Sequence, residues 1–247
     1  MMRFGLESAS AGVLVAVLAL ATLRPLPAAA VRQDATPSAP ASCATATPAS
    51  TPAMDHGSMA GMDMGTPGAD MAMEMDVEFD QLYIDMMLPH HGSIVAMAQA
   101  ALPRLQDERL REIAQNIIDT QSAEQEELRG YREQFYGSAD PAPMDAHTMD
   151  MMMTAMPGMG SMDDMMFQMN AATQVAAICV AEDSDLGFID LAIPHHEMAI
   201  AASETALEQS THSEIRNFAQ RVIDAQSAEI EELSAIRAEL SGGTPAA

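Results

Sequence analysis

Apolar residues recur at helical spacing in two separated stretches of the chain. The first stretch places them at Leu110, Ile113, Ile117 and Leu128. The second places them at Ile215, Phe218, Val222, Leu233, Ile236 and Leu240. Because side chains three and four positions apart share one face of an α-helix, both stretches predict amphipathic helices.

A further helix is predicted before each stripe, over about residues 76–102 and 185–207. Each of these contains a proline, Pro89 or Pro194, directly before a pair of histidines. A proline inside a helix removes one backbone hydrogen bond and crowds the preceding turn. We therefore expect each helix to be kinked or divided at its proline.

Together these segments form an internal repeat. Residues 80–128 align without gaps with residues 185–233, at a constant offset of 185 − 80 = 105, and 21 of the 49 aligned positions are identical. The identities concentrate in Ile-Asp-x-x-x-Pro-His-His and in Ile-Asp-x-Gln-Ser-Ala-Glu-x-Glu-Glu-Leu. Two amphipathic hairpins bury their stripes most simply against each other, which predicts an all-α, four-helix bundle.

The bundle is expected over residues 76–240. Its parts are repeat one (76–137), a long Met-rich crossover (138–184) with a short helix around Met162 to Val180, and repeat two (185–240), followed by a tail (241–247).

The N-terminal region predicts export. Arg3 precedes an apolar run over residues 11–23, and alanines at 28–30 provide a cleavage site, so residues 1–30 resemble a signal peptide. The run is shorter than the roughly 20 residues that span a bilayer, so no membrane attachment is expected after cleavage. The destination would be secreted, periplasmic or at the cell surface. Residues 31–75 lack apolar periodicity and are predicted to be a disordered tail.

The net charge of the chain indicates which kinds of binding partner to expect. The chain has 11 basic residues, all arginine, against 36 acidic ones, for a formal net charge of −25. Nucleic acids and anionic lipids need positive charge on the protein, so they are excluded as expected partners, whereas cations are attracted. Two cysteines, Cys43 and Cys179, could form one disulfide in an oxidising compartment, and the sequence leaves both this pairing and the oligomeric state open.

The high methionine content adds metal binding to the expected functions. The chain has 24 methionines, many of them in two tracts that also contain histidine and aspartate, at 54–64 and 144–169. Thioether sulfur packs as an adaptable apolar group, but it is also a soft metal ligand that suits Cu(I).

The paired histidines are the leading metal candidates: His90 and His91 in repeat one, His195 and His196 in repeat two. Adjacent helical residues point about 100° apart, so the members of a pair cannot be equivalent. The first of each pair is aligned with a methionine, Met97 in repeat one and Met198 in repeat two, and the second is free to meet another helix.

Polar residues interrupt the apolar stripe of each second helix, namely Gln121 and Glu124 and their repeat counterparts Gln226 and Glu229. Buried amides and carboxylates need partners, which facing histidines or a bound metal would supply. Asp85 and Asp190, five residues before each first histidine, are further candidate ligands.

Two alternatives accompany the metal hypothesis. The His/Gln/Glu residues could instead form a buried network that only specifies the packing of the bundle. A di-iron oxidase bundle needs Glu-x-x-His, which occurs nowhere in the sequence, and no Gly-x-Ser-x-Gly occurs either, so no enzyme activity is expected. Imidazole with thioether favours copper, with another transition metal as the alternative.

The motif Asp80-Gln-Leu-Tyr-Ile-Asp-Met-Met-Leu-Pro-His-His, followed by Met97 and Ala-Gln-x-Ile-Ile-Asp-x-Gln-x-x-Glu, closely resembles the domain of unknown function (DUF) 305 family over most of 76–135 and 183–240. The resemblance implies an exported, ferritin-like bundle linked to copper handling, with no established enzyme activity. It places the family's histidine pairs and its Gln-x-x-Glu on the residues named above. Where the family often has a methionine four residues after that Glu, this chain has Leu128 and Leu233.

Overall fold

The computed structural model describes residues 42–43 and 77–242. These residues form an all-α fold, and no strand occurs among them. The signal peptide predicted for 1–30 and nearly all of the predicted tail 31–75 lie outside the described residues. No helix in the described part of the chain combines the length and apolarity needed to cross a membrane.

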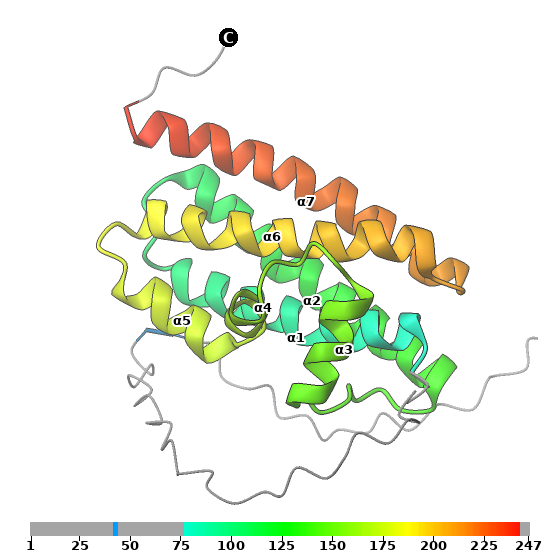
Figure 1. Ribbon diagram of the computed structural model, residues 1–247. Helices are drawn as coiled ribbons and strands as arrows, with labels where there is room; N and C mark the ends of the chain where they lie inside the picture. The colour runs from blue at the N-terminus through cyan, green and yellow to red at the C-terminus, as the bar shows by residue number, and fades with distance from the viewer. Residues whose placement is uncertain (1–41, 44–76, 243–247) are drawn as a thin grey trace, which may run out of the picture. The chain divides into compact units, whose positions relative to one another are not determined.

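Two long hairpins build the bundle. The first consists of α1 (Phe79–Ala101) and α2 (Glu108–Tyr136), and the second of α6 (Ser184–Gln209) and α7 (Ser213–Leu240). Within each hairpin the two helices pack against each other, and α1 also packs against α6. The hairpin of α6 and α7 is seen from its side in Figure 1.

Pro89 and Pro194 each lie inside one continuous helix. Of the two expected outcomes, a kink or a division at the proline, the structure excludes the division. α1 packs against α2, α5 and α6, and α6 packs against α7, so both proline-containing helices are held by neighbouring helices. Each histidine pair therefore lies on a single continuous helix.

The crossover contains more helix than its sequence indicates. Instead of one short helix it forms α3 (Ala146–Ala155), α4 (Met162–Gln168) and α5 (Ala171–Val180). Each of them is capped at its N-terminus by a side chain that accepts a hydrogen bond from a backbone N–H of the first turn; the capping residues are Asp145, Ser161 and Asn170. All three pack against α1, and α4 and α5 lie below α6 in Figure 1.

Equivalent aspartates of the two repeats hold the hairpins together. Asp80 of α1 accepts hydrogen bonds from the N–H groups of Thr211 (3.1 Å) and His212 (2.9 Å), just before α7. Asp185 of α6 accepts from the N–H groups of Gln106 (2.8 Å) and Asp107 (3.0 Å), just before α2. Since a helix N-terminus has unpaired N–H groups, each repeat caps the second helix of the other.

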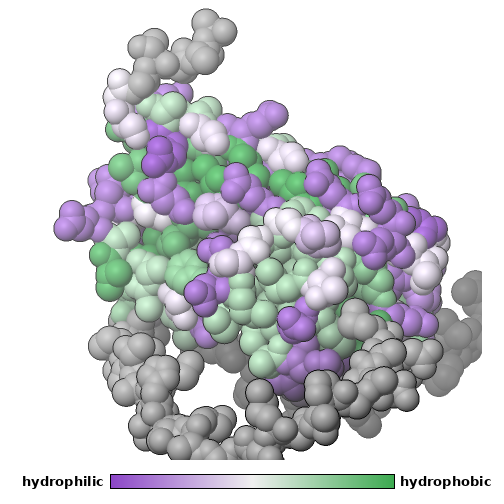
Figure 2. Space-filling model, in the orientation of Figure 1, coloured by the Kyte–Doolittle hydropathy of each residue, from purple (hydrophilic) through white to green (hydrophobic). Residues whose placement is uncertain are grey.

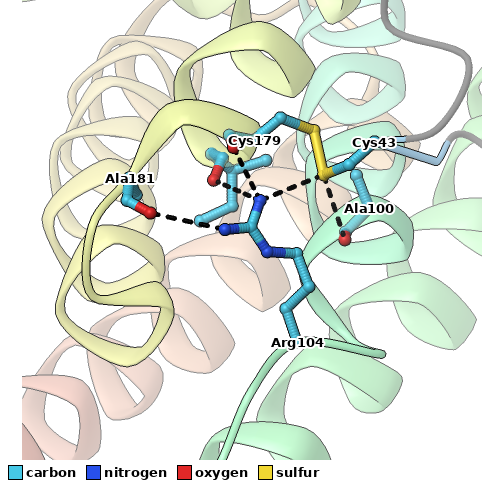
Figure 3. Close-up of a disulfide and its surroundings, with 6 residues drawn as sticks. Cys43, Ala100, Arg104, Cys179 and Ala181 are labelled. Atoms are coloured by element: carbon cyan, nitrogen blue, oxygen red, sulfur yellow. Dashed lines mark hydrogen bonds between the residues drawn. A yellow bond between two sulfur atoms is a disulfide. The ribbon is translucent and has the colours of Figure 1, made fainter.

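A disulfide joins Cys43 to Cys179 at the end of α5 (Figure 3). The guanidinium of Arg104 donates to Cys43 Sγ (3.3 Å) and to the carbonyl oxygens of Ile178 (3.2 Å), Cys179 (2.8 Å) and Ala181 (3.3 Å). The pairing that the sequence left open is thus present, and it attaches the N-terminal segment to the bundle at α5.

Candidate metal centre

All four histidines of the two motifs are fully buried where α1 faces α6. The rings of His90 and His195 lie 3.7 Å apart between centroids, with their planes inclined by 36°. Within each motif the two rings are farther apart, at 6.2 Å for His90 and His91 and 6.3 Å for His195 and His196. The first histidines of both repeats therefore meet at the interface between the hairpins.

The second histidine of each pair faces the second helix of its own hairpin. His91 Nε2 lies 2.9 Å from Glu124 Oε2 of α2, in hydrogen-bond geometry. His196 Nε2 lies 2.8 Å from Glu229 Oε2 of α7, although their orientation does not form a hydrogen bond. The predicted inequality of the two histidines is thus confirmed in both repeats.

The first histidines are neutral and incompletely hydrogen-bonded. Burial is the main cause that holds the pKa of the His90 and His195 imidazoles well below the usual 6.5, and the charge of neighbouring histidines is the second cause. Neither ring nitrogen of His90 has a hydrogen-bond partner, and neither does His195 Nδ1. Unpaired buried nitrogens are costly, and the unprotonated nitrogen of a neutral ring offers one lone pair to a ligand.

Ser93 is a neighbour that the sequence analysis missed. Its hydroxyl lies 2.9 Å from His195 Nε2 and also contacts the backbone oxygens of His90 and Gln168. The repeat alignment contained a signal for it, because 93 + 105 = 198 makes Ser93 the counterpart of Met198. The two repeats thus place a hydroxyl and a thioether at equivalent positions.

The amides predicted to interrupt the second-helix stripes are buried, as expected. Gln121 Oε1 and both amide atoms of Gln226 have no hydrogen-bond partner. They line a cavity of about 230 Å³ between α2 and α7, together with Glu124, Glu229, Thr120, Ala225 and Arg221. The two carboxylates therefore stand between this cavity and the buried histidines.

The predicted methionines are buried but occupy different surroundings. Met97 belongs to the apolar cluster that includes Leu110 and Phe188. Met198 is 5 % exposed and lines a second cavity, of about 310 Å³, with Pro194 and Met159.

Asp85 and Asp190 do not join the cluster. The buried Asp85 is paired with Arg132 of α2, and the exposed Asp190 with Arg237 of α7 at 2.7 Å. Five helical positions turn the chain by about 140°, so these carboxylates point away from the first histidines. Each is paired instead with the arginine at the equivalent position of its own repeat, and its role as a metal ligand stays a prediction.

The donor types found here fit a borderline transition-metal ion, because neutral imidazoles with unpaired nitrogens lie beside amide and carboxylate oxygens. The side chains are not arranged as a chelate. Within the described residues, no three His, Cys, Asp or Glu side chains converge as a metal-holding group.

Comparisons with known proteins agree with this architecture. The sequence profile of the family described as "Domain of unknown function (DUF305)" matches residues 28–132 and 80–237. The structure of CopM in the Cu(II)-bound form is similar at a TM-score of 0.51 and 25% identity, covering 65% of this chain and 97% of CopM. A DUF305 protein from Streptomyces coelicolor shares the fold at a TM-score of 0.53 and 20% identity, covering 69% of this chain and 98% of its own. Among curated proteins, none is significantly similar.

Proposed function

The chain belongs to the DUF305 family, and from that premise we propose that it is an exported protein that binds or buffers copper at the histidine cluster, without catalytic turnover. The cluster consists of His90, His91, His195 and His196 with the flanking Glu124 and Glu229. The observation that carries the proposal is the contact of two buried imidazoles, His90 and His195, whose ring nitrogens are incompletely paired.

Protonation supports this role. Metal binding needs the neutral imidazole, and burial keeps His90 and His195 neutral through the physiological range. No proton must therefore be released from these two rings when a cation binds. The carboxylates of Glu124 and Glu229 would supply the negative charge that balances the cation.

Access is provided by the cavity between α2 and α7. Glu124 and Glu229 are 19 % and 21 % exposed and line it, so a cation can reach carboxylates before it reaches imidazoles. A net charge of −25 raises the local concentration of cations at such an opening. Similarity to CopM, whose Cu(II)-bound form is known, supports copper as the metal.

Export is supported by the disulfide between Cys43 and Cys179, because disulfides form and persist in oxidising compartments. The similarity of residues 1–30 to a signal peptide agrees with this location.

Anaerobic titration of the full chain with Cu(I) tests the proposal. We expect His90→Ala/His195→Ala to lower the copper stoichiometry, whereas His212→Gln, which removes an imidazole outside the cluster, should not. The original chain and both variants contain the same methionine tract at 54–64, so any copper bound by that tract does not affect the comparison. Equal stoichiometry in a folded double variant, verified by circular dichroism, would remove the cluster from the proposal.

A second candidate is a purely structural network. The close contacts of His91 with Glu124 and of His196 with Glu229 favour it, because they place an imidazole nitrogen 2.9 Å and 2.8 Å, respectively, from a carboxylate oxygen, and the first of them is a hydrogen bond. A structural network predicts that the melting temperature of metal-free protein is unchanged by copper. Copper binding at the cluster predicts a rise that grows with copper concentration.

A further inference from the structure

Four methionines of the crossover line a pocket. This part of the chain contains none of the four clustered histidines. This methionine pocket has a volume of about 240 Å³ and is lined by Met144, Met149, Met166 and Met169 together with Asn170. Met144 precedes α3, Met149 lies in α3, and Met166 and Met169 lie in and directly after α4. The packing of α3 against α4 brings them together.

Core packing explains only part of this arrangement. Both helices bury other methionines completely, Met152 of α3 and Met165 of α4. The lining methionines are only partly buried, and Met166 is 44 % exposed. The face formed by α3 and α4 is accordingly pale green, hence apolar, in Figure 2. Met144, Met149 and Met169 also pack against the core, so these methionines line an open pocket with the part of each side chain that the core leaves accessible.

Sulfur is the available donor in this pocket. Among the described residues, no carboxylate or imidazole lines it. The one lining amide, Asn170, is engaged at the start of α5, where its Oδ1 accepts a hydrogen bond from Thr173 N (3.0 Å). A set of neutral thioethers selects soft monovalent cations, because it satisfies their preference for sulfur and offers no charge to harder divalent ions.

We propose that the methionine pocket is a second metal site, separate from the histidine cluster, which binds Cu(I) or Ag(I) through thioether sulfur. It does not depend on the proposed function of the cluster, because the donors come from different helices. The negative charge of the whole chain attracts the cation, and the thioethers hold it without any proton being released.

Silver titration of the full, disulfide-bonded chain tests this proposal, with Ag(I) as a redox-inert probe. Methionine methyl groups labelled with carbon-13 report binding residue by residue in NMR spectra. We expect the methyl signals of the four lining methionines to shift with Ag(I) and not with Zn(II). We also expect Met149→Leu/Met166→Leu to bind one Ag(I) fewer per chain.

The matched control is Met151→Leu/Met162→Leu, which changes one partly buried methionine in each of the same two helices outside the pocket. Leucine has nearly the volume of methionine, so both variants should fold. The control should bind as many Ag(I) ions as the original chain. Equal stoichiometry in all three proteins, or pocket methyl signals that ignore Ag(I), would overturn the proposal.

The variant His90→Ala/His195→Ala tests whether the methionine pocket binds metal independently of the histidine cluster. In that variant the pocket methyl signals should still shift with Ag(I), whether or not copper binds at the cluster. Loss of these shifts would show that the pocket is not an independent site and would overturn the proposal.

Discussion

His90 and His195 are equivalent residues of the two repeats, and their rings are in contact, with centroids 3.7 Å apart and planes inclined by 36°. Each repeat thus contributes one half of a contact that neither hairpin could form alone. Two positive charges at this distance in a buried site would repel strongly, so the fold is compatible only with neutral rings.

Protonation of these rings should destabilise the protein. In the fold the pKa of each ring is far below 6.5, so between these values the unfolded chain binds more protons than the folded one. The free energy of unfolding should therefore be highest above about pH 6.5. As the pH is lowered further, it should decrease by about 1.4 kcal/mol per pH unit for each histidine. Urea unfolding of metal-free protein between pH 5 and 8 measures this slope.

The control for that slope is His90→Gln/His195→Gln, which removes both titrating groups. Its stability should depend less steeply on pH in the same range, by about 2.7 kcal/mol per unit for the two groups together. A slope identical to that of the original chain would contradict the assignment to these two rings.

The carboxylates between the cavity and the histidines should matter for metal binding. We expect Glu124→Gln/Glu229→Gln to weaken copper binding about 10-fold or more, because neutral amides replace the charges that balance the cation. Glu126→Gln/Glu231→Gln, at exposed positions of the same helices, removes equal charge and should change affinity little. Competition with a chromophoric copper chelator gives the affinities, and equal losses in both variants would indicate only a general charge effect.

Two ion pairs occupy equivalent positions in the repeats but differ in burial, so breaking them should cost different amounts of stability. Asp85→Ala leaves Arg132 buried without its partner and should cost about 3–5 kcal/mol of stability. Asp190→Ala breaks a pair whose members are about half exposed, so its unfolding midpoint should barely move. Chemical denaturation compares the two. Because neither aspartate lies at the histidine cluster, Asp190→Ala should bind copper like the original chain, and weakened binding there would contradict the site described above.

Reduction of the disulfide should loosen the whole bundle. The bond closes a chain segment with a sequence separation of 136 residues, for which loss of the cross-link costs about 2–5 kcal/mol. We expect a lower melting temperature for Cys43→Ala/Cys179→Ala and for the reduced original chain, by similar amounts. An unchanged melting temperature on reduction would mean that the segment around Cys43 adds nothing to the stability of the bundle.

The sequence by itself predicted the hairpins and the character of their buried positions. Helical periodicity is a local property, so the stripes through Leu110 and Ile215 were sufficient to place α2 and α7. The same local geometry showed that adjacent histidines diverge, and that Gln121 and Glu124 lie on the inner side of their helix. These features follow from the 100° turn per residue, which packing does not alter.

Only the tertiary structure decided which residues meet across the repeats. The contact of His90 with His195, the reciprocal caps by Asp80 and Asp185, and the pairing of Cys43 with Cys179 all join segments that are far apart in sequence. Periodicity defines a helix face but not the neighbour of that face, since the neighbour depends on how the hairpins pack. For the same reason the sequence offered Asp85 as a candidate ligand but could not show that it pairs with Arg132, which lies 47 positions away.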